Sequence, residues 1–89
     1  MDTSIFEAKM KADGYTEIAI KAYAPQPPNG EHGHHFSVRG LVLDGAFIVF
    51  RDRKPVTYRT GDVFEVPNGC LHGEEIGSEG ARVLIGRKY

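Results

Sequence analysis

Turn-forming residues interrupt this 89-residue chain at short intervals, and this spacing limits what the chain can fold into. The apolar segments between the interruptions are short and alternate in polarity, which is typical of β-strands with one buried face. Counted in this way, the sequence offers roughly seven or eight strands at about ten-residue spacing, the pattern of an all-β sandwich or barrel. We expect a single domain over residues 1–89, because no room is left for a second one.

The positions of the expected strands follow from the turns between them. Asp44-Gly45 is a preferred two-residue hairpin turn, so the strands on either side of it should pair. Gly77 to Gly80 should separate the last two strands, and Gly40, in mid-strand, predicts a bulge or a close approach by a ligand or another backbone. The expected strands are Tyr15 to Tyr23, Phe36 to Leu43, Ala46 to Phe50, Val56 to Arg59, Val63 to Val66, Glu74 to Ile76 and Ala81 to Gly86.

The segment before the first strand, Ser4 to Asp13, can form a short helix. Ser4 and Glu7 have the spacing of a capping box, and Gly14 can end the helix. The alternative is an N-terminal strand. In the strand that follows, Ile18 and Ile20 share one face.

Three histidines fall at the ends of apolar segments. His32 and His34 are one residue apart, and side chains alternate along an extended strand, so both imidazoles should project to the same side. His72 follows a short apolar strand framed by Gly61 and Pro67. Two imidazoles on one face make half of a metal site, and His72 is the candidate for completing it.

The two stretches together resemble the two sequence motifs of the cupin family. The first motif is matched by His32, His34 and Gly45, and the second, at its usual spacing, by Gly61, Pro67, Gly69 and His72. The resemblance, to small single-domain cupins of the conserved-barrel kind, implies a double-stranded β-helix, or jelly-roll barrel, with His32, His34 and His72 as metal ligands. Val38 holds the position of the family's metal-binding glutamate. Valine cannot ligate a metal, so only the three histidines carry over.

The expected cofactor is a divalent transition metal, Fe, Zn, Ni or Mn, because neutral imidazole is a ligand for all of them. Three histidines leave at least one coordination position open. Without a carboxylate ligand the ion keeps its full charge and can accept an anionic substrate. The metal shell is similar to that of the three-histidine thiol and diketone dioxygenases among the cupins, which does not identify a substrate.

Glu74 and Cys70 are further candidates for the site. Glu74 has the parity of His72, so its carboxylate should face the cavity as a fourth ligand or as a general acid/base. The alternative is a solvated charge beside Glu75. Cys70 shares this parity but lies at a Pro-x-Gly corner, where a ligating thiol and a small buried side chain are both open.

Other polar residues are expected to lie outside the metal shell. His35 and Glu31 should point away from the two histidines, and Arg39 should lie outside the barrel, in a subunit contact. Three tyrosines could offer a hydroxyl to the cavity: Tyr15, Tyr23 and Tyr58. The core candidates, some of which would shape a small apolar pocket, are Phe36, Val38, Val42, Phe47, Val49, Phe64 and Val66.

Composition excludes some partners and favours others. Eleven basic and twelve acidic residues leave the net charge near zero, so nucleic acid is not an expected partner. The single cysteine suits a reducing compartment, and the N-terminus lacks the apolar core of a signal peptide. We expect a soluble, cytoplasmic protein without a membrane partner. Exposed barrel edges predict a homodimer.

Two functions remain open at this point. The first is a metal-dependent domain acting on a small organic molecule, as a dioxygenase with Fe(II) or as a lyase or isomerase in which the metal polarises a carbonyl. The second is a non-catalytic module that binds or senses a small molecule, because similar barrels occur as effector-binding units and a fold does not decide function.

Overall fold

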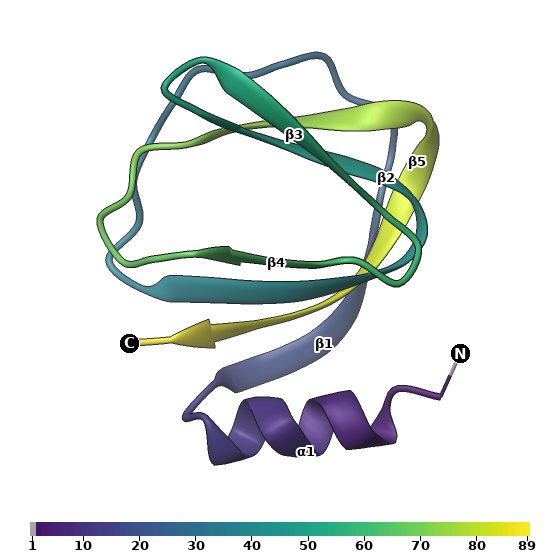
Figure 1. The fold of residues 1–89 in the computed structure, drawn as a ribbon, viewed down its shortest axis with the longest axis vertical. Helices are drawn as coiled ribbons and strands as arrows, with labels where there is room; N and C mark the ends of the chain where they lie inside the picture. The colour runs from purple at the N-terminus through teal and green to yellow at the C-terminus, as the bar shows by residue number, and fades with distance from the viewer. Residues whose placement is uncertain (1) are drawn as a thin grey trace.

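The computed structural model describes residues 2–89 as one helix and five strands in a rolled antiparallel sheet (Figure 1). The elements are α1 (Ser4–Ala12), β1 (Thr16–Tyr23), β2 (Ser37–Arg51), β3 (Lys54–Arg59), β4 (Val63–Val66) and β5 (Gly73–Lys88). The strand order is β1-β5-β2-β3, and β4 also pairs with β2. The expected all-β barrel with a short N-terminal helix is therefore confirmed.

Two long strands, β2 and β5, form the centre of the sheet. They pair along nearly their whole length, from Ser37 opposite Lys88 to Phe50 opposite Gly73. Both strands bend in the middle, where the register shifts twice. The first half of β2 pairs with β4 and the second half with β3, so the bend lets one strand contribute to both sides of the barrel (Figure 1).

Glycines make the bend possible. Gly45 has a φ of +76° and Gly80 a φ of +73°, a region that other residues adopt only at a cost. The two backbones touch there, because a Cβ on Gly45 would lie 2.0 Å from the carbonyl oxygen of Gly80. A side chain at position 45 would therefore force the central strands apart.

The hairpin expected at Asp44-Gly45 is wrong, because β2 runs through both residues. A type I′ turn needs positive φ at both central residues, and Asp44 does not have it. The hairpin of this region lies at Asp52 and Arg53, whose φ angles are 51° and 64°. The break expected between Gly77 and Gly80 is also wrong, since β5 continues through it, and five strands replace the expected seven or eight.

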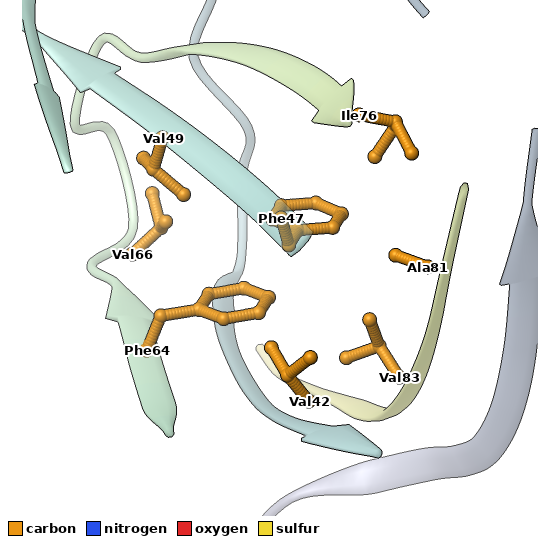
Figure 2. Close-up of a cluster of buried hydrophobic side chains, with 8 residues drawn as sticks. All are labelled: Val42, Phe47, Val49, Phe64, Val66, Ile76, Ala81 and Val83. Atoms are coloured by element: carbon orange, nitrogen blue, oxygen red, sulfur yellow. The ribbon is translucent and has the colours of Figure 1, made fainter. Parts of the chain in front are cut away.

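Apolar side chains fill the space between the two sides of the barrel (Figure 2). The Phe47 and Phe64 rings are stacked at 4.8 Å between centroids. A Cβ on Gly40 would lie 2.5 Å from the Phe64 ring, so the close Phe64 side chain requires a glycine there. The bulge expected at Gly40 is wrong, because Gly40 pairs in register with both β4 and β5. The buried cluster comprises Val42, Phe47, Val49, Phe64, Val66, Ile76, Ala81 and Val83.

Helix α1 covers the outer face of the sheet (Figure 1). Met10 is fully buried there against a second cluster that includes Leu41, Leu43 and Leu84. The expected capping box is wrong, because Ser4 is already helical and the N-cap residue Thr3 makes no capping hydrogen bond with its side chain. The Thr3 hydroxyl donates to the Glu7 carboxylate instead. The helix therefore packs on the outer face of the sheet, and the inner face lines the interior of the barrel.

The outer face also holds Arg39, as expected. Its guanidinium donates to Asp13 and to Glu65, at 2.6 Å each, and lies 4.6 Å from the centre of the Tyr15 ring. The hydrogen bond from Arg39 lowers the pKa of Asp13. Arg39 thus joins the end of α1 to the sheet, and the subunit contact expected for it stays a prediction.

Candidate metal centre

Two loops meet at one end of the barrel and carry the three histidines. The loop before β2 and the loop before β5 run side by side there (Figure 1), because the backbones of His32 and His72 pair through two hydrogen bonds, of 2.8 and 2.9 Å. The carbonyl of His34 accepts a further bond of 2.9 Å from the Gly69 amide. This local pairing brings residues 40 positions apart in the sequence to the same point.

The three imidazole rings face one another across this point. Ring centroids are 4.8 Å apart for His32 and His34, 4.8 Å for His32 and His72, and 5.1 Å for His34 and His72. One potential ligand atom from each histidine and one carboxylate oxygen of Glu74 all lie within 4.8 Å of one another. The same-side arrangement of His32 and His34 is thus found, although neither residue lies in a regular strand and only His32 forms an isolated β-bridge.

Backbone carbonyls fix the orientation of two of the rings. Nδ1 of His32 lies 3.1 Å from the carbonyl oxygen of Gly30, and Nδ1 of His72 lies 3.1 Å from that of Cys70. A carbonyl can only accept, so each Nδ1 carries the proton and donates it. This leaves Nε2 of both rings for the centre, and histidines that bind metals commonly donate from their other ring nitrogen to a carbonyl in this way.

Glu74 projects into the same group, as its parity predicts. Its Oε1 lies 3.3 Å from Nε2 of His72, which is itself only 2% exposed. Asn29 makes two hydrogen bonds to the Glu74 backbone. Its side-chain oxygen accepts from the Glu74 N–H at 2.7 Å, and its own backbone N–H donates to the Glu74 carbonyl at 3.1 Å. The alternative of a freely solvated carboxylate at position 74 does not fit this geometry.

The electrostatics of the cluster favour neutral imidazole at His34. Burial lowers the pKa of His34, and the neighbouring His72 and His32 lower it further. Neutral imidazole is the form that binds a metal.

The donor set fits a divalent transition metal. Ligands about 2.0–2.2 Å from a tetrahedral ion lie about 3.4 Å from one another, a separation that the His72–Glu74 pair already has at 3.3 Å. The remaining donors, within 4.8 Å, need only small side-chain rotations to close around an ion. Three imidazoles and one carboxylate are ligands that suit Zn, Fe, Ni or Mn.

A cavity of about 130 Å³ opens beside the histidines, inside the barrel. A cavity of about 150 Å³ accommodates benzene in another protein, so this volume suits a small organic molecule. Its polar end is formed by His34, His72 and Glu74. Its apolar wall consists of Phe36, Val38, Phe47, Val49, Phe64, Val66 and Ile85.

Charged side chains missed by the sequence interpretation also line the cavity. They are Glu17, Lys21 and Arg87. Arg87 could have been found, because alternation along the last strand places it on the face of the buried Val83. On β1, the face that carries Ile18 and Ile20 is turned outward, since Ile18 packs with the cluster under α1 and Ile20 is 50% exposed. The opposite face, with Glu17 and Lys21, therefore lines the cavity.

One of the three candidate tyrosines reaches the cavity. Tyr23 lines it, and burial together with the nearby Glu74 raises the pKa of its phenol, so the hydroxyl stays a donor at neutral pH. Tyr15 lies in the outer cluster and Tyr58 packs against Phe64 in the core. Of the three tyrosines, Tyr23 is therefore the one that can offer its hydroxyl to the cavity.

The remaining candidates lie outside the cluster. Cys70 packs against the core, and its thiol is 3.7 Å from the Leu71 carbonyl oxygen, so the apolar interpretation of this cysteine fits the structure. His35 and Glu31 are exposed, as expected. Val38 lines the cavity where the family's glutamate would stand.

Comparison with solved structures places this architecture among the cupins. A cupin 2 conserved barrel domain protein from Salinispora arenicola aligns over 79% of this chain and 60% of its own, with a TM-score of 0.66 and 24% identity. An RmlC-like cupin from Shewanella frigidimarina aligns over 79% and 62%, with a TM-score of 0.65 and 23% identity. The EutQ protein of Clostridium difficile aligns over 80% and 54%, with a TM-score of 0.68 and 14% identity.

The chain therefore has the cupin fold, and the resemblance seen in its two histidine motifs is confirmed at the level of fold. It spans from about half to two thirds of the length of these solved structures. No family model matches the sequence, and no curated protein matches it either. Within residues 2–89, no helix is long and apolar enough to cross a membrane.

Proposed function

We propose that this protein is a metal-binding cupin domain that holds one divalent transition metal through His32, His34, His72 and Glu74 and binds a small organic molecule beside it. The observation that carries the proposal is the convergence of four potential ligand atoms within 4.8 Å at the end of an apolar cavity. A metal ion would act as the polar partner of the buried His72 imidazole and the Glu74 carboxylate, because burying polar groups without a partner is costly.

Glu74 takes the place of the carboxylate that Val38 cannot supply. It comes from β5 instead of β2, two residues after His72, and it faces the same point. When bound, the metal would supply a Lewis acid able to polarise an oxygen of the ligand. The chain itself contributes the neutral imidazoles, the Tyr23 hydroxyl as a proton donor and a wall that excludes water.

Catalysis is the finer part of the proposal. A dioxygenase, lyase or isomerase would use the open coordination positions beside the cavity, and Tyr23 or Glu74 would move the proton. A non-catalytic binding module would use the same positions for its ligand. The two functions differ in turnover. Oxygen uptake with Fe(II) and a panel of small thiols, diketones and acids tests the dioxygenase, and conversion of an added molecule without oxygen uptake would indicate a lyase or isomerase.

Metal analysis of the purified protein tests the proposed centre. We expect about one transition-metal ion per chain in the parent protein, measured by plasma mass spectrometry after dialysis against Fe(II), Zn(II), Ni(II) or Mn(II) in turn. His32→Ala and His72→Ala should each lose it, because the three remaining ligands hold a divalent ion less tightly than four.

His35→Ala is the matched control, since His35 is a neighbouring but exposed histidine outside the cluster. It should keep the metal content of the parent. A parent protein without metal under all four conditions, or a loss in His35→Ala equal to that in His72→Ala, would contradict the proposal.

A further inference from the structure

The cavity beside the candidate centre has a cation next to position 38, where the family places a metal-binding carboxylate and this chain has a valine. Val38 pairs in register with Arg87 of β5 on one side and with Val66 of β4 on the other. Both Val38 and Arg87 line the cavity. A short apolar side chain and a neighbouring guanidinium therefore replace the anionic group on this side of the site.

Arg87 is held close to the histidines through an aromatic ring. Its Cζ lies 4.4 Å from the centre of the Phe36 ring, and the Phe36 ring is stacked with the His34 ring at 4.8 Å. Arginine stays charged at any physiological pH and matches a carboxylate with two parallel donors. The guanidinium is thus placed for an anion that also reaches the metal centre.

The charges around the cavity favour the same kind of ligand. Lys21 and Arg87 face a single acid, Glu17, at the outer part, and the Glu17 carboxylate already accepts the Tyr89 hydroxyl. At the inner part, Glu74 would neutralise only half of the charge of a divalent ion. The metal-loaded cavity would then carry a net positive charge, which attracts an anion.

We propose that the ligand is a small organic monocarboxylate, whose carboxylate lies beside Val38 between the metal and Arg87 and whose apolar body lies against Phe47 and Phe64. The inference rests on the proposed metal centre and names the class of molecule bound there. The ligand's own carboxylate supplies on this side of the site the negative charge that position 38 lacks. The volume of about 130 Å³ limits the body to a small branched or aromatic group.

The test uses Co(II), whose visible absorption bands change when a ligand enters its coordination sphere. The Co(II)-loaded protein is titrated with benzoate and, separately, with benzamide, a neutral molecule of nearly the same shape. We expect a saturable spectral change with benzoate and binding of benzamide weaker by about tenfold or more, because hydrogen bonds to charged groups contribute about 1.5–3 kcal/mol.

Variants locate the interaction. Arg87→Met should weaken benzoate by about tenfold or more, and Arg87→Lys should recover part of the loss, since it restores the charge without the fork of donors. Arg82→Met is the control, because Arg82 lies exposed on the same strand, outside the cavity. It should bind benzoate like the parent protein.

The outcomes separate the two levels of the proposal. If Co(II) does not bind, the metal centre fails and the carboxylate site fails with it. If Co(II) binds but benzoate and benzamide are equivalent, or Arg87→Met binds benzoate as tightly as Arg82→Met does, the metal centre stands and the carboxylate inference is wrong.

Discussion

In the proposed metal centre, position 74 supplies the carboxylate that the cupin pattern gives to position 38. Val38 and Glu74 both line the cavity, on β2 and β5 respectively, so either position can present a side chain to the histidines. In the proposed centre the carboxylate comes from another strand, while the three imidazoles match the cupin motifs. This relocation can be tested by moving the carboxylate back.

We predict that Glu74→Gln lowers the affinity for Zn(II) by about tenfold or more and that adding Val38→Glu restores most of it. The amide keeps the size of the side chain but removes the negative charge that binds the ion. Affinity is measured by competition with a chromophoric chelator. If Glu74→Gln binds Zn(II) like the parent, Glu74 is not a ligand, and the general acid/base role proposed for it becomes the one to measure by turnover.

At the scale of the elements, the bend shared by β2 and β5 decides the shape of the barrel. Each strand passes from one side of the barrel to the other at glycines whose backbones touch, and the histidine loops lie at the ends of these two strands. A change at the bend should therefore disturb the fold far more than a similar change in a turn.

We predict that Gly45→Ala destabilises the protein by about 3–5 kcal/mol, in the range of the most severe single substitutions. The new Cβ would lie 2.0 Å from the Gly80 oxygen, and φ is positive as well. Gly61→Ala is the matched control, since φ is +91° there but no atom lies within 4 Å of the new Cβ. It should cost only about 1–2 kcal/mol.

Urea unfolding followed by circular dichroism measures both variants. Equal losses for Gly45→Ala and Gly61→Ala would show that the backbone angle alone matters and that the contact with Gly80 can relax.

At the scale of the whole molecule, a chain of 89 residues has little core with which to stabilise a barrel. Its apolar contacts are divided between an inner cluster and an outer cluster under α1. A ligand that binds only the folded state should therefore have a large effect on stability. The homodimer expected from the exposed strand edges stays a prediction, and sedimentation velocity would test it.

We predict that saturating metal raises the thermal midpoint by more than about 10 °C. A free metal concentration of 100 times Kd stabilises the folded state by about 2.7 kcal/mol, and 1 kcal/mol shifts the midpoint of a domain of this size by about 4–8 °C. Calorimetry with and without a chelator measures the shift. His72→Ala should show no difference between the two conditions, and a shift equal to that of the parent would place the metal elsewhere.

Much of the site could be predicted from local sequence. Alternation placed His32 and His34 on one side and gave Glu74 the parity of His72, because both inferences need only a few consecutive residues in extended backbone. The same rule would have found Arg87. Alternation could not show which face of β1 turns inward, because that depends on the helix that packs against the outside of the sheet.

The sequence by itself determined the strand-rich composition and the two histidine motifs, since these follow from local periodicity and from turn residues, whereas it left the N-terminal segment open between a helix and a strand. Only the tertiary structure decided that Asp44-Gly45 and Gly77 to Gly80 are bends within long strands instead of turns between short ones. A glycine permits a bend and a turn equally, and the choice is made by the partner strand, because β2 and β5 pair on both sides of each glycine segment. That same long-range pairing brings Glu74 and Arg87 to the histidines.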